Sequence, residues 1–148
     1  MSYSNLTTDK LRLEVERLLI KNIKLCQDNF LYFVKEMWPD FIYRKTSKQD
    51  NWGHHQIIAN EFTSIAANKK GRLIINMPPR HTKSEFASIY FPAWMIGKFP
   101  KMKIMQVSHN TELAVRFGSK VRNIVGSPEY KQIFGDVKLR EDSKAKGR

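Results

Sequence analysis

Residues 72–85 read Arg-Leu-Ile-Ile-Asn-Met-Pro-Pro-Arg-His-Thr-Lys-Ser-Glu, and this stretch decides which fold the sequence predicts. Its first half, Leu73 to Met77, is a short apolar run that ends at two prolines. The run is too short for a helix and does not alternate, which favours a strand buried on both faces. A polar loop and then an amphipathic segment follow, so the order predicted is strand, loop, helix.

The same order repeats downstream. Residues 86–97 predict a helix, 103–108 (Lys-Ile-Met-Gln-Val-Ser) a second strand, and 111–125 a further amphipathic helix. Alternating strands and helices are typical of parallel βαβ packing, so the fold class predicted is α/β. Upstream, helices are expected over about 11–26, from an N-cap at Asp28 to Pro39, and over about 54–68. On the first of these, one stripe is expected to face inward: Leu11, Val15, Leu18, Leu19, Ile23 and Cys26.

Composition limits the classes of function. The chain has 148 residues, 41% of them hydrophobic and 27% charged, which is a globular composition. Its net charge of +12 favours polyanionic partners, namely nucleic acid, nucleotides or an anionic membrane, without deciding among them. The longest apolar-rich stretch, 89–97, is far shorter than the roughly 20 residues that span a membrane, and the polar N-terminus predicts no export signal. The single cysteine, Cys26, excludes an intrachain disulfide.

The loop over residues 77–84 carries the chemistry. A turn between a strand and a helix presents free backbone N–H groups and the positive end of a helix dipole, which together bind anions. Lys83 and Ser84 match the end of the phosphate-binding pattern GxxxxGK[ST], in which the lysine reaches phosphates and the hydroxyl ligates Mg²⁺. Both glycines of the pattern are missing, because their places hold Met77 and Thr82. We hypothesise that Thr82 has an ordinary helical conformation and that the loop still binds phosphate; a solvated basic turn is the alternative.

Residues 72–85 closely resemble the variant Walker A segment of tailed-phage large terminase subunits, which commonly reads Pro-Pro-Arg-His-Gly-Lys-Ser; Thr82 departs from it. The resemblance covers about residues 30–135. It includes Trp52 and His54-His55 upstream and, downstream, Phe91-Pro-Ala-Trp94, Val107-Ser108-His109, Leu113-Ala114, Phe117, Val121-Arg122, Ser127, Tyr130 and Phe134. It implies a P-loop NTPase of the ASCE type that powers packaging of double-stranded DNA into procapsids in the host cytoplasm. Residues 1–52 would be a helical segment and 53–148 the first part of the ATPase domain, incomplete at its C-terminus, with the acid-pair motif and the nuclease domain absent.

The resemblance also implies roles for individual residues. Lys83 would bind the β- and γ-phosphates of ATP, Ser84 would hold Mg²⁺, and Arg80 would contact the phosphates as a charge stabiliser. His81 and Thr82 would donate backbone N–H groups, and Gln56 or His55 would lie near the adenine. The implied partners are duplex DNA, a portal protein and a small terminase subunit, and the full-length chain would form a ring. The fragment alone is expected to hydrolyse ATP poorly or not at all.

Two other functions stay open at this point: a different P-loop translocase of the helicase type, and a basic DNA-binding module whose degenerate loop binds no nucleotide. A metal at His54 and His55 is disfavoured, because adjacent helix residues do not converge on one ion. His109 is taken as a loop histidine rather than a nucleotide contact, and the three tryptophans as core rather than base-stacking platforms. The basic residues from Lys138 to Arg148 are either solvated charge or a DNA contact.

Overall fold

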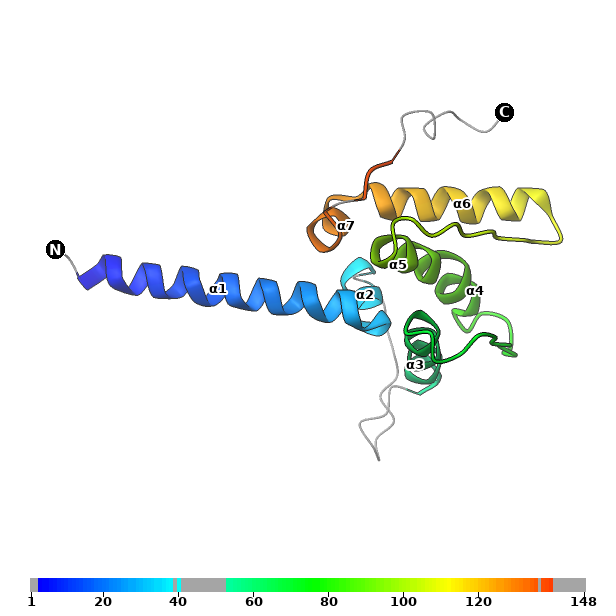
Figure 1. Ribbon diagram of the computed structural model, residues 1–148, viewed down its shortest axis with the longest axis horizontal. Coiled ribbons are helices and arrows are strands. Elements are labelled where there is room, and N and C mark those ends of the chain that lie inside the picture. The colour runs from blue at the N-terminus through cyan, green and yellow to red at the C-terminus, as the bar shows by residue number, and fades with distance from the viewer. Residues whose placement is uncertain (1–2, 39, 41–52, 136, 140–148) are drawn as a thin grey trace.

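The computed structural model describes residues 3–38, 40, 53–135 and 137–139 (Figure 1). The helices are α1 (Tyr3–Asp28), α2 (Phe30–Met37), α3 (His54–Ala66), α6 (Thr111–Gly126) and α7 (Pro128–Ile133). Between α3 and α6 a helical stretch runs without interruption through α4 (Lys83–Glu85), the π-helical turn η1 (Phe86–Tyr90) and α5 (Phe91–Lys98). In the described ranges every regular element is therefore a helix.

The predicted α/β fold class is wrong for the described part of the chain, which is all-α. Residues 73–77 and 103–108, the two expected strands, have no regular secondary structure. None of the described backbone hydrogen bonds joins either run to another segment, and a strand forms only when its backbone N–H and C=O groups are paired. Leu73, Ile75 and Met77 still pack against the core, but Ile74 and Met105 are almost fully exposed, at 89% and 87%.

Helix α1 is present as expected, but its apolar stripe is not buried. Figure 1 shows α1 projecting away from the other helices, with only its C-terminal end beside them. Leu11, Val15, Leu18 and Leu19 are all more than half exposed, whereas Cys26, near the end of the same stripe, is 1% exposed. Burial of α1 therefore begins only in its last turns, where it contacts α2, α5 and α7.

Helix α2 begins one residue later than expected. The N-cap is Asn29 rather than Asp28, and its side-chain oxygen accepts hydrogen bonds from the N–H groups of Leu31 (2.9 Å) and Tyr32 (3.3 Å). These bonds satisfy two of the donors that every helix start leaves unpaired. The cap turns the chain sharply after α1, which lets α2 fold back against it.

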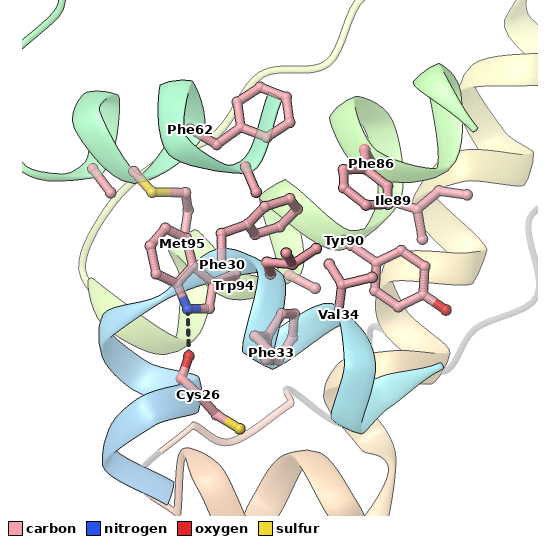
Figure 2. Packing of buried hydrophobic residues seen from close by; sticks show 14 of the residues in the cluster. Cys26, Phe30, Phe33, Val34, Phe62, Phe86, Ile89, Tyr90, Trp94 and Met95 are labelled. Atoms are coloured by element: carbon pink, nitrogen blue, oxygen red, sulfur yellow. Dashed lines mark hydrogen bonds between the residues drawn. The ribbon is translucent and has the colours of Figure 1, made fainter. Parts of the chain in front are cut away.

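The hydrophobic core lies where α2 meets α3 and the helical stretch from Lys83 to Lys98 (Figure 2). Phe30, fully buried, is its centre: the rings of Phe62, Phe86 and Phe91 meet it edge to face with centroids 5.2 to 5.8 Å away. Edge-to-face pairs are a favoured geometry for aromatic rings. Trp94 also packs on Phe30 and is completely buried, as expected for a core tryptophan.

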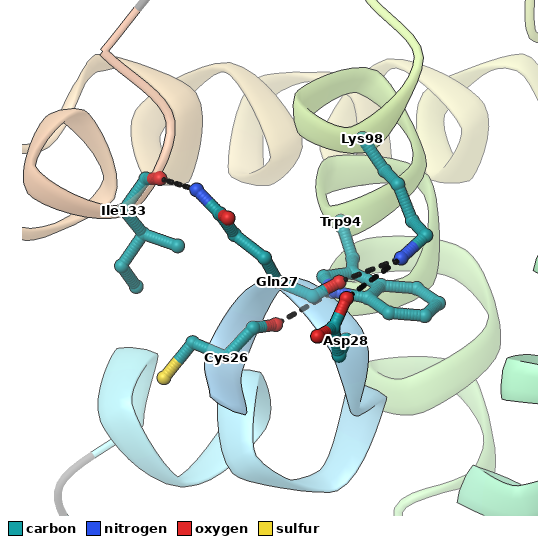
Figure 3. A network of polar contacts seen from close by, with 6 residues as sticks. All are labelled: Cys26, Gln27, Asp28, Trp94, Lys98 and Ile133. Atoms are coloured by element: carbon teal, nitrogen blue, oxygen red, sulfur yellow. Dashed lines mark hydrogen bonds and ion pairs between the residues drawn. The ribbon is translucent and has the colours of Figure 1, made fainter. Parts of the chain in front are cut away.

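Polar contacts tie the C-terminal end of α1 to the other helices (Figure 3). The indole Nε1–H of Trp94 donates to the carbonyl of Cys26 at 2.9 Å, and the Nζ of Lys98 donates to the carbonyl of Gln27 at 2.9 Å. The side-chain amide of Gln27 donates in turn to the carbonyl of Ile133 at 2.6 Å. The first two bonds satisfy carbonyls that the end of a helix leaves without partners, so α1 is fixed to α5 and α7 at one end only.

None of the described helices is long and apolar enough to cross a membrane. The expected boundary between residues 52 and 53 adjoins residues 41–52, which lie outside the described part of the chain, and it stays a prediction.

Candidate functional site

The loop between residues 77 and 83 has two residues with left-handed backbones. Arg80 has a φ of 64° and Thr82 a φ of 58°, both in the region that favours glycine. Such conformations are costly outside glycine and gather at functional sites. The loop is also closed upon itself, because the Nζ of Lys83 donates to the carbonyl of Met77 at 3.4 Å.

The hypothesis that Thr82 has a helical conformation is wrong. With φ 58° and ψ 8° it is left-handed, and it is the N-cap of α4. This is the position of the second glycine in the pattern GxxxxGK[ST], and Thr82 has a backbone conformation that favours glycine although the residue is β-branched.

Thr82 is held by two hydrogen bonds. Its Oγ1 donates to the carbonyl of His81 at 2.6 Å, and it lies 2.9 Å from the Nε2 of His55. Because the hydroxyl has a single proton, and His81 accepts it, Nε2 of His55 is the donor in the second bond. This hydrogen bond links helix α3 to the loop, although the two residues are 27 positions apart in the sequence.

Among the polar residues in the described part of the chain, His55 is the one whose side chain is buried, at 6% exposed. Its ring lies 5.4 Å from the ring of Phe86. Its pKa is lowered from the usual 6.5 to about 4, mainly by burial and to a smaller extent by the neighbouring His54 and His81. The imidazole is therefore neutral at physiological pH.

The first turn of the helix after the loop is open to an anion. The N–H groups of Lys83, Ser84 and Glu85 have no partner within the helix, and no side chain caps them. The one carboxylate of this turn, on Glu85, faces Lys120 of α6 at 3.0 Å. Its charge is partly compensated there, which lowers its repulsion of an anion at the loop.

The remaining loop side chains are exposed. Arg80 lies on the surface beside the turn, and the ring of His81 donates from Nδ1 to the carbonyl of Pro79 at 2.8 Å. Ser84 is exposed, and its hydroxyl offers a single oxygen to a cation. In the described ranges no three His, Cys, Asp or Glu side chains gather as they would around a metal ion. The donor set thus fits Mg²⁺ only where phosphate oxygens supply most of its ligands.

An open cavity of about 400 Å³ adjoins the loop. Lys83 and Ser84 line it together with apolar side chains, among them Phe62, Ile65, Leu73, Ile75 and Phe91. Neither of the residues expected near an adenine, Gln56 and His55, lines this cavity. Gln56 instead donates to the side chain of Asn60 one turn along α3, at 2.7 Å.

Among the other candidates, His109 is exposed just before α6, and none of its described contacts reaches the loop. Trp38 stacks on Tyr90, with centroids 5.4 Å apart, and packs against the core as expected. Trp52 and most of the basic tail (Arg140, Lys144, Lys146 and Arg148) lie outside the described residues.

The structure adds two partners that sequence reasoning missed: His55 for Thr82, and Lys120 for Glu85. His55 shares the apolar stripe of α3 with Ile58 and Phe62, at helical spacing, and this pattern could have indicated its burial. The pairing across α6 and α4 had no sequence signal.

Comparison with family models, with curated proteins and with solved structures found no match.

Proposed function

We propose that this chain binds ATP through the loop over residues 77–85, as part of a large terminase subunit that powers packaging of double-stranded DNA. The observation that carries the proposal is the loop itself. Two left-handed residues turn the backbone, and a helix then opens with unpaired N–H groups beside the ammonium of Lys83. Such concave backbone turns at a helix start bind phosphate.

Each loop residue has a role in this proposal. When ATP binds, the Nζ of Lys83 gives up its long hydrogen bond of 3.4 Å to the Met77 carbonyl and contacts the β- and γ-phosphates instead. Arg80 adds its guanidinium donors, while the backbone N–H groups of His81 and Thr82 contribute to the cradle. The Ser84 hydroxyl ligates Mg²⁺, which when bound neutralises phosphate charge.

The packaging role, with its DNA, portal and small-subunit partners and its ring, rests on the sequence resemblance over residues 30–135 together with the net charge of +12. The charge supports contact with a phosphate backbone without reading base sequence. In the described ranges we identify no carboxylate placed to activate water, so we expect residues 1–148 to bind ATP and to hydrolyse it poorly.

The test compares two lysine-to-alanine variants of equal charge. Lys83→Ala removes the loop ammonium, and we expect it to abolish the rise in melting temperature that Mg²⁺-ATP gives the wild type, because binding to the folded state raises apparent stability. Lys101→Ala is the matched control: it is exposed and lies three residues beyond the other end of the same helical stretch, which is about 24 Å long.

A rise in melting temperature that survives Lys83→Ala, or that both variants lose equally, contradicts the proposal. DNA binding that ignores ATP and survives Lys83→Ala would instead favour the basic DNA-binding module.

A further inference from the structure

We infer that His55 is a positioning residue that takes over the task of the missing second glycine: its hydrogen bond to Thr82 holds a β-branched residue in the left-handed conformation that the phosphate loop requires. The inference deepens the proposed function and rests on it where ATP binding is concerned. The coupling between the two residues is a property of the folded loop and can be measured without any nucleotide.

The geometry behind the inference begins with the backbone. A left-handed conformation is accessible to glycine at no steric cost but is strained for threonine. Thr82 nevertheless adopts it, at φ 58° and ψ 8°. Since the β-branched side chain disfavours this conformation, contacts of Thr82 must offset its cost.

The contacts that can offset this cost are few. The hydroxyl of Thr82 bridges the preceding carbonyl of His81 and the Nε2 of His55. The first contact is local and moves with the loop. The second comes from α3, a different element, so it can restrain where Thr82 lies and which way its Cβ points.

His55 is itself fixed in place. It is 6% exposed, it sits in the first turn of α3, and its ring packs beside Phe86, the first residue of η1 and a member of the core. A donor that is buried and packed on both sides loses little further freedom when it bonds to Thr82. The same bond pairs a ring N–H of a buried side chain, and a buried donor without a partner is costly.

The hydroxyl of Thr82 and the imidazole of His55 thus act as a pair. When residue 82 is glycine, we expect the loop to keep its conformation without a hydrogen bond from His55. His55→Phe keeps a planar ring against Phe86 and removes the donor. Thr82→Gly removes the strain that the donor offsets. The two changes and their combination form a double-mutant cycle that isolates the pairwise contribution.

The experiment measures two quantities on all four proteins. The first is the Kd of a fluorescent ATP analogue with Mg²⁺. The second is the rate of tryptic cleavage after Arg80, an exposed loop residue, which reports the order of the loop without nucleotide. We expect His55→Phe to raise the Kd and the cleavage rate about tenfold when residue 82 is threonine, equivalent to one buried hydrogen bond, and by less than about twofold when it is glycine.

Equal effects of His55→Phe in the two backgrounds, or no effect in either, overturn the inference. If the wild type does not bind ATP, the proposed function fails while the cleavage rates still decide the coupling. If ATP binds but His55→Phe has the same effect with threonine and with glycine at residue 82, the proposed function stands and the inferred role of His55 is wrong.

Should His55→Phe not fold, Thr82→Val removes the hydroxyl from the other side with little change of shape. It is then compared with Thr82→Gly: the inference expects the valine variant to be cleaved faster than the wild type and the glycine variant not to be. Equal cleavage of the valine variant and the wild type overturns it.

Discussion

At residue 82 the side chain departs from the glycine of the motif, but the backbone has the left-handed conformation that glycine favours. A left-handed threonine is less stable than a left-handed glycine by about 1–2 kcal/mol, and one buried hydrogen bond contributes about as much. Since the His55 contact is at 2.9 Å and partly buried, the two effects are of similar size. The departure at residue 82 therefore does not by itself exclude a phosphate loop.

The lowered pKa of His55 makes stability depend on pH in a defined direction. Its folded-state pKa is about 4 against 6.5 for the exposed group, because burial disfavours the charged form and His54 and His81 lie beside it. Above pH 6.5 His55 is neutral in both states, and the free energy of unfolding keeps its full value. As pH falls from 6.5 towards 4, the free energy of unfolding decreases, because the unfolded chain binds the proton first. The loss is about 3 kcal/mol at most.

We expect the free energy of unfolding, measured with urea, to fall between pH 6.5 and 4 by less in His55→Phe than in the wild type. Carboxylates that titrate in this range are common to both proteins and cancel in the comparison. Parallel curves for the two proteins would show that His55 is not buried and neutral in the fold.

At the scale of elements, two helical glycines have opposite surroundings. A Cβ on Gly97 of α5 would lie 2.4 Å from a ring carbon of Phe134, whereas a Cβ on Gly118 of α6 would meet nothing within 4 Å. Because Gly97 has no side chain, the Phe134 ring can lie directly against α5. Gly118 has no such packing role in the described structure.

Gly97→Ala should therefore destabilise the protein by about 1–3 kcal/mol through overpacking. Gly118→Ala should stabilise it by about 0.5–1 kcal/mol, because alanine is the better helix former. Thermal or urea unfolding of the two variants measures the difference. Equal effects of the two alanines would place Phe134 away from α5.

At the scale of the whole molecule, the core is concentrated around α2, and the greater part of α1 lies outside it. Phe33 is completely buried, with its ring 6.1 Å from that of Tyr130 and 5.9 Å from that of Phe134. Leu18, on the projecting part of α1, is 57% exposed. An apolar residue contributes to folding only in proportion to the area it buries.

Phe33→Ala should consequently destabilise the protein by about 3–5 kcal/mol. Leu18→Ala should change the free energy of unfolding by no more than about 0.5 kcal/mol, as substitutions at exposed positions do. Urea unfolding at a low protein concentration tests both. A loss of more than about 2 kcal/mol on Leu18→Ala would show that this face of α1 is covered in solution.

The sequence by itself determined where the helices lie and where the special loop begins. Helical spacing predicted α1, α3, α6 and a helix over 86–97, which in the structure runs from Lys83 to Lys98. Such spacing is informative because a helix pairs its own backbone and its apolar face repeats locally. Lys83 and Ser84 marked the start of the helix after the loop in the same local way.

Only the tertiary structure decided the rest. Residues 73–77 and 103–108 have the composition of strands but not the structure, since pairing requires a partner that the run itself does not specify. The stripe of α1 has the pattern of a core but is exposed, because burial depends on which elements meet it. Thr82 is left-handed beside His55 for the same reason: two residues 27 positions apart are brought together by packing, and no local pattern encodes their contact.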